Sequence, residues 1–146
     1  TSHDSVACRG YRITTPLGRV AGVATDLGYV SDEVLANLLL ADVVALEANY
    51  DYNMLMTGPY PYYLKRRILG DYGHLSNENA GRLLNCILHD NLKHIFLGHL
   101  SKENNYEELA YETVRLEISQ GDSPYTASDF PITVAKRDEM SPIVTL

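Results

Sequence analysis

The sequence is poor in three features, and each shortage excludes a class of protein. It has only two cysteines, Cys8 and Cys86, in 146 residues, too few for a disulfide framework, so a reduced cytoplasmic setting is expected. No run of 18 apolar residues occurs, and no membrane-spanning helix is therefore expected. Basic residues are outnumbered, with 12 Lys and Arg against 19 Asp and Glu and a net charge of −7. This balance argues against a long basic groove for nucleic acid, and it leaves a local basic patch or a metal-centred site possible.

The length suits one domain with a sizeable hydrophobic core. The opening residues, TSHDSVACRG, lack the pattern of a signal peptide. Because residue 1 is Thr and not Met, we expect the chain to be a piece of a longer protein.

Hydrophobic periodicity and turn residues predict a mixed order of elements, ββαβααβαββ. The Tyr-, Pro- and Gly-rich stretch from Asn49 is predicted to be a long loop that feeds a helix near 61–69. The predicted strands are 11–14, 19–24, 42–48, 92–97, 131–136 and 142–146. The other helices are predicted to begin at Ser31, at Ser76 and at Asn104 or Asn105, and the last one to end at Gly121.

One four-residue phrase occurs twice. Gly-His-Leu-Ser spans 73–76 and 98–101, and each copy is followed after one residue by Glu-Asn. A predicted loop precedes His74, whereas a predicted strand precedes His99, and two short copies cannot stack as a solenoid. We therefore interpret the phrase as two histidines supplied separately to a site, and not as a structural repeat.

Ligand-type side chains lie near the ends of three predicted strands. His99 follows directly on one strand, Asp26 follows another with Gly28 allowing a tight turn, and His3 precedes the first. Ends of buried strands are where α/β folds gather ligands. The three side chains suit Zn, Mn or Fe if they converge, and unlinked loop residues are the alternative.

The remaining histidines are not expected to join such a site. His94 lies five residues before His99, and side chains alternate along a strand, so the two should point to opposite faces. His89 falls at a helix C-terminus, where an imidazolium complements the helix dipole in a structural or surface role. Cys8, close to His3, is interpreted as a small buried residue in a turn.

The stretch YPYYLKRR mixes tyrosines with Lys65, Arg66 and Arg67. Aromatic rings that stack on bases beside a basic patch would suit single-stranded nucleic acid. A tyrosine-rich loop packed under its own side chains, with a solvated basic turn, is the other interpretation.

A series of motifs in fixed order resembles a known family: SHDS, GYRI, GVATDLGYVSD, LEANYD, GPYPYYLKRRILGDYGHLSNENA and LGHLSKENN. Together they look like the C-terminal half of a metallo-β-lactamase-fold hydrolase. They are most similar to the YycJ/WalJ branch, bacterial proteins related to the phosphodiesterases and nucleases of that superfamily. The resemblance runs from Thr1 to about Ile118, and the late strands also fit.

The resemblance implies a binuclear site for two divalent metal ions, Zn or Mn. It assigns His3 to one metal, Asp26 to a bridging position and His99 to the other metal. His74 matches a substrate-side histidine that contacts a phosphate oxygen or protonates the leaving group. Without the resemblance, His74 is interpreted as a helix-cap neighbour that bonds to the backbone.

The resemblance also implies an α+β fold, the αββα sandwich, in which residues 1–146 form the C-terminal half as a mixed sheet flanked by helices. The His-x-His-x-Asp-His segment of the family's N-terminal half is absent from the sequence. A lone half would expose the face meant for its partner. We therefore expect either the missing N-terminal half as a partner or a homo-oligomer.

The implied function is metal-dependent hydrolysis of phosphodiester bonds, as in a nuclease or exonuclease acting on DNA or RNA. Two metals would activate a hydroxide and clamp the attacking and leaving oxygens. One alternative is a small-molecule phosphodiesterase or other ester hydrolase of the same fold. Another is an inactive half that serves as a binding or dimerisation module, and the isolated fragment is expected to be inactive.

Overall fold

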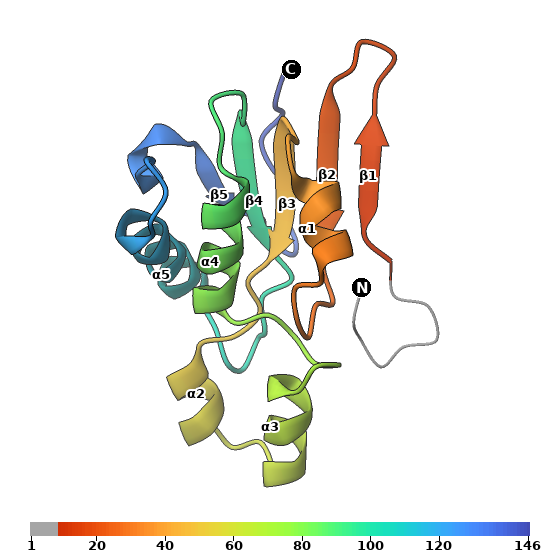
Figure 1. Ribbon diagram of the computed structural model, residues 1–146. Coiled ribbons are helices and arrows are strands. Elements are labelled where there is room, and N and C mark those ends of the chain that lie inside the picture. The colour runs from red at the N-terminus through yellow and green to blue at the C-terminus, as the bar shows by residue number, and fades with distance from the viewer. Residues whose placement is uncertain (1–8) are drawn as a thin grey trace.

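The computed structural model describes residues 9–146 of the chain. A five-stranded mixed sheet with the order β1-β2-β3-β4-β5 forms its centre (Figure 1). β1 pairs antiparallel with β2, and the remaining neighbours are parallel. The strands are β1 Tyr11–Thr14, β2 Val20–Ala24, β3 Val43–Glu47, β4 His94–Gly98 and β5 Ile132–Val134.

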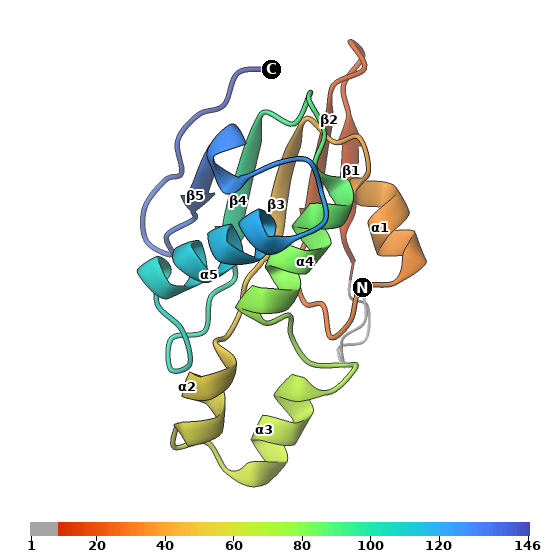
Figure 2. The same ribbon diagram turned by 60° about the vertical axis from the view of Figure 1, so that its left-hand side comes forward.

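Three helices lie along one face of the sheet, and two others lie beyond its end, where β3 and β4 finish (Figures 1 and 2). The first three are α1 Asp32–Leu38, α4 Asn77–Ile87 and α5 Glu107–Gln120. The other two are α2 Tyr52–Thr57 and α3 Tyr62–Leu69, and a short 3₁₀ helix, η1, spans Ala127–Asp129. Among the described residues, no helix is both long and apolar enough to cross a membrane.

The core lies between α4, α5 and the sheet. Ser76 begins α4 as predicted, because its hydroxyl accepts a hydrogen bond from the Asn79 N–H at 3.2 Å. The apolar stripe of α4 is buried against alternate residues of β3 and β4. These core residues are Ala80, Leu83, Leu84, Ile87, Val44, Leu46, Ile95 and Leu97.

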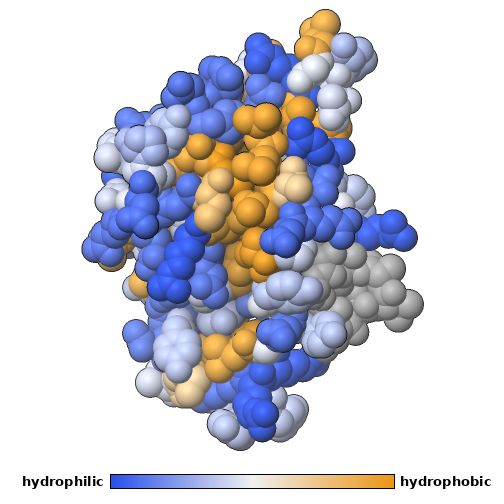
Figure 3. All heavy atoms as spheres, viewed as in Figure 1, coloured by the Kyte–Doolittle hydropathy of each residue, from blue (hydrophilic) through white to orange (hydrophobic). Residues whose placement is uncertain are grey.

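Hydrophobic side chains also reach the surface on the helical side, in a strip along the middle of the molecule (Figure 3). There, a groove of about 350 Å³ is lined by residues that include Val30, Leu35 and Leu83. On the opposite face of the sheet, Val23, Ala45 and Phe96 are only half-buried, because the helices of residues 9–146 do not pack there.

Two predictions about helices need correction. The stretch after Asn49 is not one long loop, since α2 forms there with the Asp51 carboxylate accepting from the Met54 N–H at 2.8 Å. The helix is too short for a hydrophobic period to show. The last helix begins at Glu107, after Asn105. Asn105 does not cap it in the predicted way, because its side-chain amide is bonded to the carbonyls that follow β3.

The predicted strand 142–146 is wrong. The segment has no regular structure, and Ile143 is 87% exposed. Its Ile, Val and Thr residues favour a strand by propensity. The sheet as described ends at β5, however, and offers the segment no pairing partner. The other predicted strands and the helix starts at Ser31 and Ser76 are confirmed.

Candidate metal centre

Side chains from three parallel strands meet at one end of the sheet. Asp26 follows β2, Glu47 is the last residue of β3, and His99 follows β4. Parallel strands bring their carboxyl ends to the same edge, so these residues become neighbours. His74 joins them from the loop that precedes α4. One ligand-type atom from each of the four lies within 4.8 Å of the others.

Glu47 is the centre of this group. Its side chain has no exposed surface, and Oε1 lies 2.7 Å from Nδ1 of both His74 and His99. The second oxygen, Oε2, accepts the backbone N–H groups of Leu27 at 2.8 Å and Leu75 at 3.3 Å. A buried carboxylate is costly unless donors surround it, and here all four partners can donate.

These contacts fix the protonation of the group. Burial raises the pKa of Glu47, but the hydrogen bonds from His74, His99 and the Leu27 N–H outweigh burial and hold the pKa below its usual value. The bond to Glu47 raises the pKa of His99, although burial opposes it. An ionised carboxylate only accepts hydrogen bonds, so the Nδ1 atoms of both histidines are the donors to Glu47.

The two histidines approach Asp26 differently. Nε2 of His99 lies 3.8 Å from Asp26 Oδ1, whereas the His74 atom at 3.8 Å from the same oxygen is Nδ1. His74 thus approaches both carboxylates with Nδ1, whereas His99 approaches Glu47 with Nδ1 and Asp26 with Nε2. The arrangement of His99, with a carboxylate on Nδ1 and Nε2 facing the carboxylate of Asp26, is typical of metal-binding histidines.

The backbone is left-handed at two of the four residues, Asp26 and His99, with φ of 57° at each. Non-glycine residues rarely adopt this conformation, and it clusters at functional sites. The Asn49 amide holds the His99 carbonyl at 2.6 Å. Gly28 packs the Asp26 loop against the loop of Asp71, because a Cβ at Gly28 would lie 2.0 Å from the Asp71 oxygen. Close approach, and not a positive φ, is what requires glycine there.

The repeated phrase now has a geometric explanation. In both copies the serine hydroxyl accepts from the backbone N–H three residues later, Ser76 from Asn79 and Ser101 from Asn104, each at 3.2 Å. Both histidines, two residues before these serines, meet the same oxygen of Glu47. Each copy therefore supplies one histidine to the same carboxylate oxygen and one serine that accepts a backbone N–H.

A buried amide network ties these turns to β3. The side chains of Asn77 and Asn105 exchange hydrogen bonds at 2.8 and 3.0 Å. Asn105 also donates to the carbonyls of Ala48 and Asn49, each at 3.0 Å. Satisfied buried polar networks of this kind favour one arrangement of the surrounding loops.

The other sequence-predicted residues are distributed differently. His3 and Cys8 lie outside the described residues. The Lys65 ammonium donates to the Met56 and Gly58 carbonyls at 2.7 and 2.8 Å and so holds the turn between α2 and α3. Arg66 and Arg67 are exposed on α3, and only Arg67 lines a cavity with His74.

The two remaining histidines have structural contacts away from the group. His94 stacks on Phe96, and its Nε2 lies 2.8 Å from the Thr133 hydroxyl. Nε2 of His89 lies 3.1 Å from the Ala41 carbonyl, and its Nδ1 accepts the Asn91 N–H.

Glu47 is the residue that sequence reasoning missed. The available signal was an acidic residue at the end of the apolar strand VVALE. A charged side chain in that position requires partners once the strand is buried.

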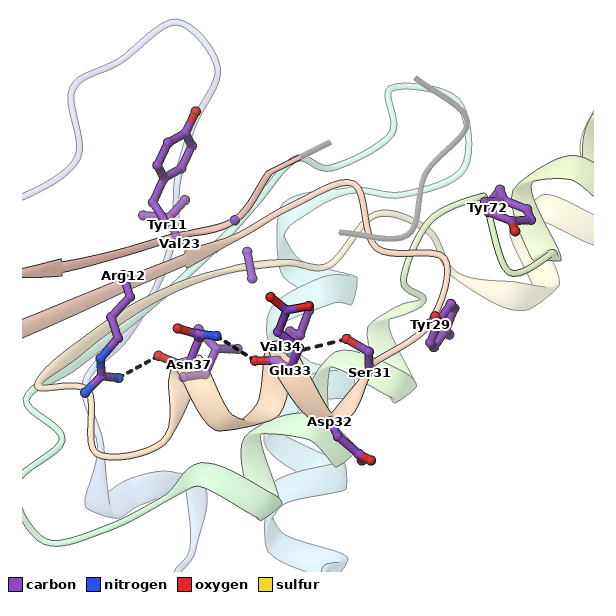
Figure 4. A pocket seen from close by; sticks show the side chains of 13 residues that line it. Tyr11, Arg12, Val23, Tyr29, Ser31, Asp32, Glu33, Val34, Asn37 and Tyr72 are labelled. Atoms are coloured by element: carbon purple, nitrogen blue, oxygen red, sulfur yellow. Dashed lines mark hydrogen bonds between the residues drawn. The ribbon is translucent and has the colours of Figure 1, made fainter. Parts of the chain in front are cut away.

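Another cavity lies away from the group. It has a volume of about 680 Å³ between the start of the sheet and α1, and neither Asp26 nor His99 lines it. Figure 4 shows Arg12 donating to the Asn37 carbonyl beside this cavity, and Tyr29 and Tyr72 at one end. His74 and His99 instead line two other cavities, of about 280 and 540 Å³.

Comparison with known proteins gives relatives of one kind. The chain is 39% identical over 145 residues to the exodeoxyribonuclease WalJ of two Streptococcus pneumoniae strains, which covers 99% of the chain and 53% of the relative. It is 40% identical over 119 residues to the exodeoxyribonuclease YycJ of Bacillus anthracis, covering 82% of the chain and 43% of the relative. No family model matches. The chain spans about half the length of the curated relatives it matches.

A solved structure supports the fold. The metallo-β-lactamase-fold protein YhfI from Bacillus subtilis superposes with a TM-score of 0.56 at 20% identity, covering 93% of the chain and 44% of YhfI. The predicted resemblance to the YycJ/WalJ branch and the predicted α+β class, a mixed sheet with helices, are confirmed.

Proposed function

We propose that the full-length protein is a metal-dependent nuclease that removes nucleotides from DNA ends, and that residues 1–146 are the C-terminal half of its metallo-β-lactamase-fold domain. The observation that carries this proposal is the group of Asp26, Glu47, His74 and His99 at the carboxyl ends of the strands. The name of the relatives, exodeoxyribonuclease, supplies the substrate class.

The donor set fits a divalent metal. Asp26 has a carboxylate that is 36% exposed, and its Oδ1 lies 3.8 Å from Nε2 of His99. Together with His3, which the resemblance adds, these oxygen and nitrogen donors suit Zn or Mn. We propose that Asp26 bridges two such ions and that His3 and His99 hold one each. Bound divalent ions would supply Lewis acidity and an activated nucleophile at neutral pH.

His74 is proposed to serve the substrate. Its Nδ1–H is engaged by Glu47, which orients the ring. We propose that Nε2, the other ring nitrogen, contacts a phosphate oxygen or gives a proton to the leaving oxygen. The position of His74 on the wall of a cavity supports this role.

An N-terminal half is the proposed partner of this chain. The half-buried face of the sheet, with Val23, Ala45 and Phe96, offers an apolar surface for a second sheet. The relatives are long enough to contain one. We also place the protein in the cytoplasm, where the exposed free thiol of Cys86 would stay reduced.

The test uses the full-length protein with end-labelled DNA in the presence of Zn or Mn. We expect stepwise shortening of the labelled DNA. This shortening should stop when the metal is chelated, and it should be lost in Asp26→Asn. Asp32→Asn, which changes an exposed carboxylate in the first turn of α1, is the matched control. RNA and a small phosphodiester are assayed in parallel, and cleavage of the small diester without cleavage of DNA would reject the nuclease assignment.

A further inference from the structure

A second cavity opens beside His74, on the side of α3. It has a volume of about 280 Å³. Leu64 and Ile68, one turn apart on α3, form one wall. Tyr60 precedes this helix and Tyr72 follows it, and both residues line the cavity.

The polar groups of the cavity are placed unevenly. His74 belongs both to the cavity and to the group around Glu47. Asn49, which bonds to the His99 carbonyl, also lines it. The cavity is therefore lined by apolar and aromatic residues on or beside α3, and by polar residues that adjoin the candidate metal centre. Arg67, also on α3, adds a cation to the lining.

Local contacts hold this shape without a ligand. The Lys65 ammonium bonds to two carbonyls in the turn between α2 and α3. The His74 N–H donates to the Ile68 carbonyl at 3.1 Å, and a Cβ at Gly73 would lie 2.0 Å from that same oxygen. The loop that carries His74 is thus packed directly onto the end of α3.

We propose that this cavity binds the base of one unpaired nucleotide, the one that adjoins the scissile phosphate on the His74 side. The proposal rests on the proposed nuclease function and adds that the nucleotide beside the scissile phosphate is unpaired when it is bound. Tyrosine rings and aliphatic side chains stack on bases of any sequence. The volume is near the lower limit of small-ligand pockets, which accommodates one nucleotide and not a base pair.

The test combines a protein change with a substrate change in the full-length protein. Tyr60→Ala should lower kcat/KM for single-stranded DNA about 10-fold to 100-fold, as loss of one stacked base predicts. The loss should disappear when the substrate lacks the base at one of the two positions flanking the scissile bond. Tyr60→Phe keeps the ring and should act like the wild type. Tyr63→Ala, on the same helix but 74% exposed and outside the cavity, is the control.

An equal loss for intact and abasic substrates at both positions would overturn the proposal. A second measurement separates it from the nuclease assignment: binding of thymidine monophosphate to the metal-free protein, followed by NMR. Binding that Tyr60→Ala weakens and Tyr63→Ala does not would support the cavity even if the wild type cuts no DNA. Absence of binding to the wild type, or equal binding to all variants, would reject the cavity even if DNA is degraded.

Discussion

The carboxylate of Glu47 organises the candidate site although it touches no solvent. A buried charge is tolerated only when its partners compensate the lost hydration. Two imidazole and two backbone N–H donors do so here. One residue thereby orients both histidines and raises the pKa of His99.

Replacing Glu47 by glutamine should weaken metal binding about 10-fold to 100-fold, the usual cost of losing the partner of a ligand histidine. The glutamine side chain has the same shape, but it has one accepting oxygen, whereas the carboxylate has two for its four donors. Calorimetric titration of the full-length protein with Zn measures the effect. Glu33→Gln, an exposed change on α1, is the control, and equal affinities for the two variants would contradict the prediction.

Asp26→Asn should reduce bound metal in the full-length protein more than His74→Ala does. A bridging carboxylate neutralises charge on both ions. The nitrogen of His74 that lies near Asp26 is Nδ1, which is already hydrogen-bonded to Glu47, so this nitrogen is not expected to bind metal. Metal content after desalting, measured by elemental analysis, checks this. If His74→Ala loses metal as fully as Asp26→Asn, the roles assigned to these residues are wrong.

His74→Ala should lower turnover on DNA while metal content and fold stay intact. A positioned general acid typically contributes about 10²–10⁴-fold. If the proton goes to the leaving oxygen, the loss should shrink for a nitrophenyl diester, whose leaving group needs no proton. An equal loss on both substrates would favour stabilisation of a phosphate oxygen, and no loss on either would return His74 to a structural role.

Sequence motifs identified three of the grouped residues, Asp26, His74 and His99, because each lies in a loop after or before a recognisable element. Glu47 was not identified, since its importance depends on burial and on two loops that are distant in sequence. The different surroundings of the basic residues could not be predicted either. Lys65 donates to a carbonyl in the turn before α3, whereas Arg67 lines the cavity beside His74, and both depend on tertiary contacts.

At the scale of elements, short apolar runs made the buried strands β3 and β4 predictable. The polar residues that reach the site come at their ends, with Glu47 as the last residue of β3 and His99 directly after β4. α2 was missed because it buries a single residue, Leu55, and its start depends on the Asp51 side chain. The segment 142–146 has the composition of a strand but no neighbour to pair with in the described sheet.

The packing of the Asp26 loop against the loop before His74 makes a specific prediction. Gly28→Ala should lower the free energy of unfolding by about 1–3 kcal/mol, as overpacking does, because its Cβ would collide with the Asp71 carbonyl. Gly98→Ala is the matched control, since its Cβ would meet only the Ala135 Cβ at 3.8 Å. Urea unfolding of the full-length variants measures both, and equal stability would show that the two loops are not tightly packed.

At the scale of the whole molecule, the chain has a complete helical layer on one side of its sheet and a half-buried face on the other. Sheets of this kind need cover on both faces for stability. The curated relatives are about twice as long as the matched region. The proposed N-terminal half would supply both the cover and the remaining metal ligands.

The 146-residue chain alone should therefore show negligible hydrolase activity with Zn or Mn. Its described residues bring one aspartate, one glutamate and two histidines together, and Glu47 is consumed in holding the histidines. Adding the separately produced N-terminal half should restore DNA cleavage, and sedimentation should show a one-to-one complex. Self-association of the chain without that half would mean that a second copy covers the apolar face. Robust metal-dependent turnover by the chain alone would show that its own ligands suffice, and the assignment as half of a site would then fail.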